Sequence, residues 1–304
     1  MTLSLLVSLE PDVHLPNLCC MPNCCNRHAK PEVAKSHESS ALAVDFPSEL
    51  HFLAESGEEY CPKSGVRVRH RATIDFGRKM CRRGNNMQNS LSALKAAGTA
   101  VIADVFDSLQ KTPPVLDTCI RPVGPPTVFA GPAYTVTGES VRFTGADHAK
   151  LAAIDNMTEG AVAVWASRCA KNCCCFGDLL ASAMRARGCV AAVVDGGVRD
   201  TAFLAEFGMP VVARYRTPVQ GVGRWRVTGS QVKVWVRGAL EEWLCVAPGD
   251  IVVGDSDGQI VIPQQLLEEI TAKVIEWSRL ETGARAEIIA GLPLLEALKK
   301  YGHL

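Results

Sequence analysis

Residues 189–200 read CVAAVVDGGVRD. The first six residues form an unbroken apolar run, which is typical of a strand buried on both faces of a parallel sheet. The Asp-Gly-Gly of residues 195–197 follows, and its glycines free the backbone where the strand ends. Arg199 and Asp200 come next, in the turn or in the first turn of another helix. Because ligand sites of α/β proteins favour such strand ends, this stretch predicts both a mixed α/β sheet and the place of a functional site.

A second motif, Gly177-Asp178-Leu179-Leu180, opens a predicted helix just before that strand, and the helix is expected to end near residue 187. The first turn of a helix presents unpaired N–H groups and the positive end of the helix dipole. It can therefore bind a carboxylate without a basic side chain. On these four residues alone, the alternative is that Asp178 only caps the helix and the leucines face the core.

Arg199 and Asp200 carry the side-chain chemistry of the first motif. A carboxylate with few neighbouring ligands suits Mg²⁺ or Mn²⁺, because Mg²⁺ keeps several waters and accepts substrate oxygens. An arginine beside it can bind an oxo or carboxylate oxygen and stabilise an enolate. The alternative for this pair alone is a surface ion pair or a helix cap.

The composition is that of a globular protein. The chain has 304 residues, 47% of them hydrophobic and 21% charged, and its formal net charge is zero. Such a chain can bury one large core or two small ones. It has no global field that favours nucleic acid or an anionic membrane, so we expect neither as a partner. No apolar run approaches the roughly 20 residues of a membrane span.

Thirteen cysteines fall as doublets, a triplet and singles. This pattern differs from the spaced framework of a small secreted disulfide domain, so we expect reduced thiols and a cytoplasmic protein. Two doublets and a histidine within residues 19–28 superficially resemble zinc ligands, but no second ligand pair follows at a suitable spacing. The triplet 173–175 is expected to fill the core, because no histidine lies close by in sequence to activate a thiol.

The first 88 residues show little periodicity and are interrupted by prolines, which predicts a largely disordered N-terminal extension. Its segment 63–83 is rich in lysine and arginine, as a solvated basic arm or a nucleic-acid contact would be.

From residue 89 to 304, helix and strand signals alternate, which predicts one α/β domain. Thr99 and Asp147 are placed to cap helices, the first running to about residue 109. Further strands are expected at residues 131–137, 161–165, 210–215, 232–236, 251–253 and 259–262. An amphipathic helix is expected at residues 264–277.

At these motifs the chain resembles the RraA-like family, which includes 4-hydroxy-4-methyl-2-oxoglutarate aldolases and the regulator of ribonuclease activity A. The family hallmark is an aspartate, twenty intervening residues and then Arg-Asp, and here Asp178 precedes Arg199-Asp200 at that spacing. The resemblance spans roughly residues 92–304. Further matching positions are residues 102–104 (IAD), 131–136 (GPAYTV) and 246–253 (VAPGDIVV), Asp147, Gly188, Asp257, Gly258, Glu281, Arg285 and Gly291.

The resemblance implies a β/β/α swivelling-type sandwich that assembles as a homotrimer or as a hexamer of two trimers, with sites near subunit interfaces. It implies that the 177–180 turn and Arg199 bind substrate, that Asp200 holds Mg²⁺, Mn²⁺ or another divalent cation, and that Glu281 reaches a neighbouring subunit's site as a further catalytic residue. Asp147-His148 departs from the Asp-Asn often found there, and the cysteine triplet is also unusual. We therefore expect a different substrate shape near those positions.

The function that the resemblance implies is that of a divalent-metal-dependent lyase. It would cleave 4-hydroxy-4-methyl-2-oxoglutarate or a related 4-hydroxy-2-oxo acid to pyruvate, with oxaloacetate decarboxylation as a side activity through the same enolate. The proton-transferring base stays open among Asp178, Asp195, Glu281 and a metal-bound water. The alternative function is a non-catalytic regulator that binds a ribonuclease or another protein partner.

Overall fold

The computed structural model describes the chain from residue 59 to residue 302, apart from residues 61–66, 69–70, 126–127, 168–169 and 171, with side chains described from Asn86 onward. The cysteine doublets of residues 19–28, the side chains of the basic segment 63–83 and most of the predicted N-terminal extension lie outside these described residues.

The strands and helices follow one another along the described chain in a mixed order. The strands are β1 (Glu59–Tyr60), β2 (Arg67–Val68), β3 (Arg121–Pro122), β4 (Phe129–Ser140), β5 (Val162–Ala166), β6 (Cys174–Phe176), β7 (Ala191–Val198), β8 (Val211–Arg216), β9 (Trp225–Ser230), β10 (Val234–Arg237), β11 (Trp243–Val246), β12 (Ile251–Gly254) and β13 (Gln259–Ile262). The helices are α1 (Arg71–Ser108), α2 (His148–Asp155), α3 (Asp178–Ala186), α4 (Thr201–Glu206), the 3₁₀ turn η1 (Gln264–Leu266), α5 (Leu267–Ile289) and α6 (Leu294–Tyr301).

Strand β7 lies inside the main sheet. It begins at Ala191, two residues into the apolar run, and it does not end at the Asp-Gly-Gly as predicted, because Asp195 still pairs with Ala166 of β5 and Gly197 with Tyr215 of β8. The order in that sheet is β13-β12-β4-β5-β7-β8-β3, and β6 and β9 pair with β7 and β4 off this path. The central strands β4, β5, β7 and β8 run parallel, as Val162 opposite Ala191 illustrates. All eight residues of β7 are buried, as expected for a parallel strand covered on both faces. The predicted mixed α/β fold is confirmed.

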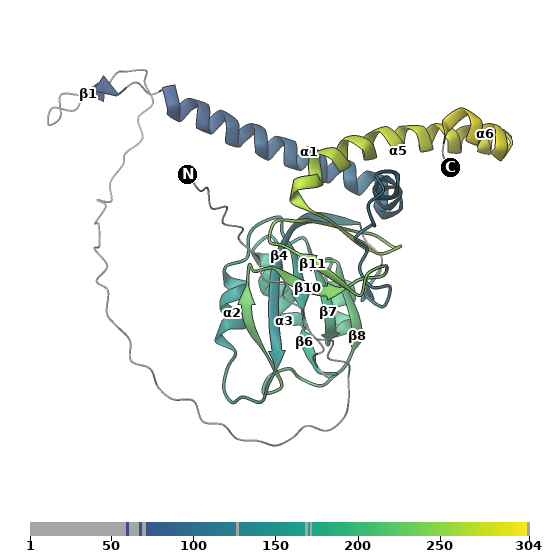
Figure 1. Cartoon of the computed structure of the whole chain (residues 1–304). Helices are drawn as coiled ribbons and strands as arrows, with labels where there is room; N and C mark the ends of the chain where they lie inside the picture. The colour runs from purple at the N-terminus through teal and green to yellow at the C-terminus, as the bar shows by residue number, and fades with distance from the viewer. Residues whose placement is uncertain are drawn as a thin grey trace, which may run out of the picture. The chain divides into compact units, whose positions relative to one another are not determined.

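The main sheet is the middle of three layers (Figure 1). Residues of α2, α3 and α4, among them Ile154, Met184 and Leu204, pack on one face of the sheet. The ribbon of β10 and β11 packs on the opposite face through Val236 and Leu244. These layers form the β/β/α sandwich that the sequence led us to expect.

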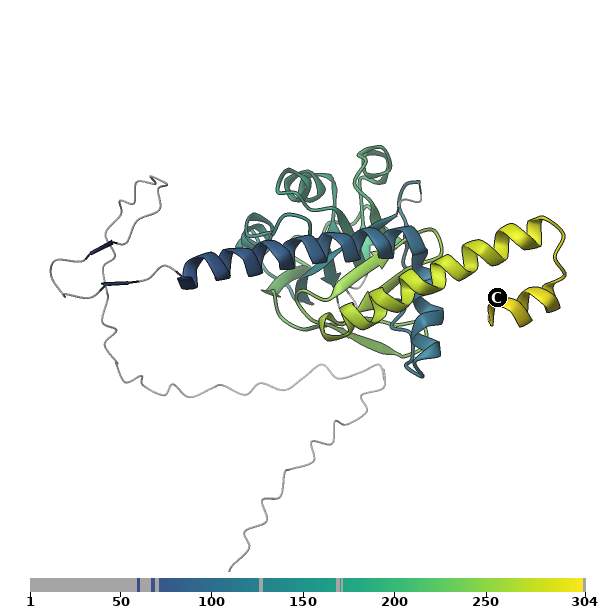
Figure 2. The same ribbon diagram turned by 90° about the horizontal axis from the view of Figure 1, so that it is seen from above.

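Helices α1 and α5 lie side by side and cover β12 and β13 (Figure 2). Helix α1 begins at Arg71, closer to the N-terminus than the expected start of ordered structure at residue 89. The reason is local, since no proline lies between Pro62 and Pro113 to interrupt a helix. Among the described residues, no helix is both long and apolar enough to cross a bilayer.

A kink at Gly98, with φ 84° and ψ 166°, divides α1 just before Thr99. The predicted helix start at Thr99 is therefore correct, but the residue that caps it is different. The carboxylate of Asp255, in the turn between β12 and β13, accepts hydrogen bonds from Thr99 N at 2.7 Å and from Thr99 Oγ1 at 2.7 Å. The Asp255 side chain thus caps this helix, a role that the sequence predicted for the Thr99 side chain.

The elements that bear the two motifs are adjacent in space. Strand β6 leads into α3 through Gly177, and β7 leads into α4 through Arg199 and Asp200. Because β6 and β7 are parallel neighbours, both connections leave the same edge of the sheet. Asp147 caps α2 by accepting Lys150 N, as predicted.

Candidate functional site

The first turn of α3 forms one wall of the site. Gly177 is the N-cap residue, in extended backbone, and Asp178 begins the helix. Asp178 Oδ1 accepts a hydrogen bond from Leu179 N at 2.7 Å. Leu179 is 76% exposed while Leu180 packs partly against the core, so only one of the two leucines faces inward. The alternative role for this motif, a cap with both leucines in the core, is therefore wrong for Leu179.

The turn between β7 and α4 forms the adjoining wall. Asp200 is the N-cap residue of α4 and has the left-handed backbone conformation, with φ 57°. Its Oδ2 atom lies 3.3 Å from Arg199 Nε and accepts a long hydrogen bond of 3.4 Å from Asp178 N. The structure thus brings together the two motifs that are twenty residues apart in sequence. A non-glycine residue held at positive φ is uncommon, and such positions cluster at functional sites.

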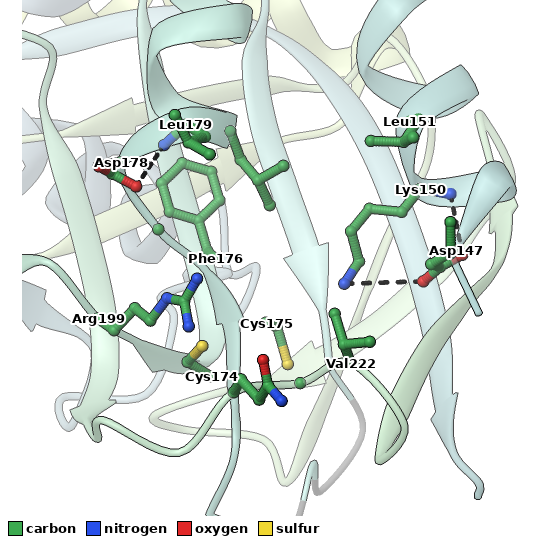
Figure 3. Close-up of a pocket in the computed structure, with 15 residues that line it drawn as sticks. Asp147, Lys150, Leu151, Cys174, Cys175, Phe176, Asp178, Leu179, Arg199 and Val222 are labelled. Atoms are coloured by element: carbon green, nitrogen blue, oxygen red, sulfur yellow. Dashed lines mark hydrogen bonds and ion pairs between the residues drawn. The ribbon is translucent and has the colours of Figure 1, made fainter. Parts of the chain in front are cut away.

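A pocket of about 250 Å³ opens in front of these turns (Figure 3). The residues that line it come from the start of α2, from β6 and α3, from the β7–α4 turn and from the 220–222 loop: Ala146, Asp147, Lys150, Leu151, Cys174, Cys175, Phe176, Gly177, Asp178, Leu179, Leu180, Arg199, Gln220, Gly221 and Val222. Asp200 lines an adjoining hollow of about 270 Å³, and Arg199 lines both. Arg199 therefore stands between the pocket and the Asp200 carboxylate.

Lys150 is a site residue that the sequence reasoning missed. It lines the pocket, and its side chain is only 10% exposed. The available signal was its place three residues after the helix cap Asp147, which puts it on the first turn of α2. Because lysines are rarely buried unless they are paired, the burial of this ammonium beside the pocket makes Lys150 a candidate for ligand binding.

The cysteine triplet forms part of the pocket floor. Cys174 and Cys175 line the pocket, and all three thiols are buried. Burial raises the pKa of Cys174, so this thiol stays protonated near neutral pH. A hydrogen bond with Cys175 lowers the pKa of Cys173 to about 7, but Cys173 does not line the pocket. These thiols fit the expected role of core filling rather than nucleophilic attack.

Asp195, one of the candidate bases, is turned away from the pocket. It is 6% exposed, and its Oδ1 accepts a hydrogen bond from Arg214 Nε at 2.6 Å. Its Oδ2 accepts Arg237 N, at the end of β10, at 3.1 Å. Arg214 also bonds Asp117 at 2.7 Å. Because side chains alternate along a strand, Asp195 shares the β10–β11 face of β7 and has a structural role there.

Glu281 does not meet the other predicted site residues within this chain. It lies on α5, and Arg285 Nη2 donates to its Oε1 at 2.6 Å, one helical turn away. It does not line the pocket that contains Arg199. Of the four predicted bases, Asp178 is thus the side chain that lines this pocket.

The donor set at Asp200 fits a hard divalent cation. The Asp200 side chain is 36% exposed, and its Oδ1 makes no hydrogen bond or ion pair within the described part of the chain. The described residues contain no group of three or more His, Cys, Asp or Glu side chains able to hold a metal. One accessible carboxylate suits Mg²⁺, which keeps waters and takes substrate oxygens, and does not suit the closed ligand set of structural Zn²⁺.

Comparison with known proteins identifies the family of the chain. The family model described as RraA-like, Aldolase/RraA, matches residues 99–261, which is more than half of the chain. This chain belongs to the RraA-like family. Protein DlpA of Legionella pneumophila is 27% identical to this RraA-like protein over 218 residues, which cover 71% of this chain and 34% of DlpA. The chain therefore spans about a third of the length of DlpA.

Three further proteins are similar to this RraA-like protein in sequence or in fold. A Halalkalibacterium halodurans protein named "Putative 4-hydroxy-4-methyl-2-oxoglutarate aldolase" is 28% identical over 187 residues, which cover 60% of this chain and 80% of that protein. The structure of an uncharacterized protein from Pseudomonas syringae has a TM-score of 0.60 and 26% identity, covering 69% of this chain and 96% of its own. Streptomyces coelicolor RraAS2 shares the fold, with a TM-score of 0.58 and 23% identity over 66% of this chain and 98% of RraAS2.

Proposed function

We propose that this protein is a divalent-metal-dependent aldolase that cleaves 4-hydroxy-4-methyl-2-oxoglutarate or a related 4-hydroxy-2-oxo acid to pyruvate. The observation that carries the proposal is the double contact of Asp200 Oδ2 with Asp178 N and with Arg199 Nε. It joins a helix N-terminus, a guanidinium and a carboxylate where the pocket meets the adjoining hollow. These are the groups that binding and cleaving a 2-oxo acid require.

Binding of the 2-oxo acid end falls to α3 and Arg199. The positive end of the α3 dipole favours the substrate carboxylate, and the Arg199 guanidinium can bond the carboxylate or the neighbouring oxo oxygen. Asp200 would hold Mg²⁺ or Mn²⁺, and this cation would supply Lewis-acid polarisation of the oxo group.

Cleavage begins when a base removes the proton of the 4-hydroxyl group. The bond between carbons 3 and 4 then breaks, its electron pair passes to the 2-oxo group, and pyruvate enolate forms. Arg199 stabilises the negative charge that develops on that oxygen. Asp178 is our choice of base, because it is the one of the three candidate carboxylates that borders the pocket. Oxaloacetate decarboxylation yields the same enolate, so we expect it as a side activity.

Glu281 enters the proposal as a residue that acts on a neighbouring subunit's site in a homotrimer or hexamer. What supports this is its position on α5 outside the pocket of its own chain, with 38% of its side chain exposed. Each site would then require two chains.

The test is pyruvate release by the full chain from a panel of 4-hydroxy-2-oxo acids and oxaloacetate, with and without added Mg²⁺ or Mn²⁺. We expect metal-dependent release that falls by about 10²-fold or more in Asp200→Asn and in Arg199→Met, since each change removes a transition-state contact. Matched controls are Asp155→Asn and Arg226→Met, which remove one member of an exposed ion pair outside the pocket. Folded wild-type protein that releases no pyruvate with any metal, or folded Asp200 and Arg199 variants with full turnover, would sink the proposal.

A further inference from the structure

Lys150 faces Arg199 across the pocket (Figure 3). Arg199 extends from the β7–α4 turn on one side, and Lys150 extends from the first turn of α2 on the other, with Cys175 between them and Cys174 on the Arg199 side. The pocket therefore carries a cationic group at each of two opposite sides. The proposed chemistry uses only the Arg199 side.

The Lys150 ammonium is held in place without a hydrogen-bond acceptor of its own. Its Nζ atom lies 3.7 Å from Asp147 Oδ2 and 5.3 Å from the centre of the buried Trp225 ring. Asp147 Oδ2 already accepts a hydrogen bond from Val227 N at 2.9 Å, and Asp147 Oδ1 accepts one from the backbone N–H of Lys150 at 3.1 Å. Within the described part of the chain, Nζ makes no hydrogen bond, although an ammonium carries three donors.

A nearly buried charge with unused donors is costly unless a partner arrives. An anionic oxygen group inside the pocket would compensate this cost. Water cannot do so fully, because only 10% of the Lys150 side chain is exposed to solvent. Asp147 and Trp225 keep the ammonium aimed there, because they restrain it from two sides. A carboxylate is the group that fits.

The space between the two cations is largely apolar. Leu151, Phe176 and Val222 line it, along with the neutral Cys174 thiol. An aliphatic segment fits such a surface better than a polar one. The pocket is therefore matched to a ligand with an anionic group at each end and carbon in the middle.

We infer that Lys150 is a specificity-determining residue that binds the distal carboxylate of a dicarboxylic 2-oxo acid. The 2-oxo end lies at α3 and Arg199, and this orientation rests on the proposed function. A 4-hydroxy-2-oxo acid that ends in an alkyl group leaves the donors of the Lys150 ammonium without a hydrogen-bond acceptor and is the poorer substrate.

The first experiment compares Lys150→Met with Lys150→Arg in the full chain. Met keeps the aliphatic stem beside Trp225 and removes the charge, whereas Arg keeps the charge. We expect Lys150→Met to lower the ratio of kcat/KM for a dicarboxylic over a monocarboxylic 4-hydroxy-2-oxo acid by about tenfold, mainly through KM, and Lys150→Arg to preserve most of that ratio. The control is Lys233→Met, which removes a positive charge at an exposed position. An equal loss for both substrates overturns the inference while leaving the aldolase proposal intact.

The second experiment uses binding alone and so separates the two proposals. Calorimetry in the presence of Mg²⁺ should show the wild-type chain binding 2-oxoglutarate about tenfold or more tightly than 2-oxobutanoate, and Lys150→Met should lose most of this difference. This result supports the inference even if no substrate is cleaved. A wild-type chain that binds both ligands equally, or does not bind 2-oxoglutarate, overturns it whether or not the variants fold.

Discussion

The Oδ2 atom of Asp200 lies 2.7 Å from the position that a Cβ atom on residue 177 would occupy. Real Cβ atoms do not approach other heavy atoms this closely, so a Cβ atom at position 177 would displace the carboxylate from its present position. The backbone of Gly177, with φ −156° and ψ −170°, is ordinary extended chain and does not itself require glycine. The glycine is therefore needed for the space that Asp200 occupies.

Gly177→Ala should displace the Asp200 carboxylate and weaken the site more than the fold. We expect at least a tenfold loss in affinity for Mn²⁺, used as a spectroscopic probe, and a comparable loss in kcat/KM, with a midpoint of thermal unfolding within a few degrees of wild type. Gly258→Ala is the matched control, because a Cβ there meets nothing within 4 Å. Unchanged Mn²⁺ binding in Gly177→Ala would show that the displaced carboxylate is not the ligand.

The parts of the fold that the sequence predicted are those determined by local chemistry. The apolar run before Asp195 predicted burial on both faces, and it supplies the first half of β7. Asp147 caps α2 and Gly188 follows α3 at φ 81°, as turn and cap preferences require. The spacing of Asp178 and Arg199 also predicted that the two motifs meet, because the intervening helix and strand return the chain to the same sheet edge.

The parts that were not predicted depend on contacts between distant residues. Asp255 caps the helix at Thr99 from 156 residues away. Asp195 looked like a member of the site because it follows the strand, yet it pairs with Arg214 on the other face of the sheet. Lys150 was not predicted because its place on the first turn of α2 does not show that its side chain lines a pocket, whose other walls come from residues 174–180, 199 and 220–222.

Asp195→Asn should destabilise the protein rather than change the chemistry. The substitution leaves Arg214, whose side chain is 23% exposed, paired with Asp117 alone. Breaking a buried pair costs about 3 to 5 kcal/mol, and we expect the lower end because Asp117 remains. Urea unfolding at equal protein concentration measures this, with Asp155→Asn in an exposed pair expected to cost no more than about 1 kcal/mol. Lost turnover at unchanged stability would instead restore Asp195 as a base.

Asp117 should make the protein more sensitive to acid. Burial acts to raise the pKa of Asp117, but hydrogen bonds from Cys119 N–H and Arg214 outweigh it and hold the pKa below its ordinary value of 3.8. A carboxyl group whose pKa is lowered in the folded state stabilises that state fully when the pH is above the ordinary pKa. This stabilisation is lost as the pH falls through the lowered pKa. The difference in free energy of unfolding between wild type and Asp117→Asn should therefore be largest near neutral pH and shrink below about pH 4. A difference that grows on acidification would contradict this.

Asp255→Ala should loosen the contact between α1 and the β12–β13 turn. The carboxylate accepts both polar groups of Thr99. Loss of such a cap costs about 1 to 2 kcal/mol, and faster amide exchange should follow in the turn of α1 after Gly98. Asp257→Ala is the control in the same turn, since its side chain makes no hydrogen bond among the described residues. Equal effects of the two substitutions would rule out the capping role.

Glu281 offers a test of whether two chains share each site. If Glu281 serves a neighbouring subunit, Arg199→Met and Glu281→Gln chains are each inactive alone but, when coexpressed and purified together, form some sites with both residues intact. Pyruvate release should then rise well above the sum of the two separate variants. Light scattering should give a mass of three or six times 32.7 kDa for the mixed and the wild-type protein. The control mixes Arg199→Met chains with Asp200→Asn chains. Both residues lie in the β7–α4 turn and serve the same site from the same chain, so every site in this mixture lacks one of them and activity should not recover. Recovery in the control as well, or none in the Glu281 mixture, would place Glu281 outside the shared site.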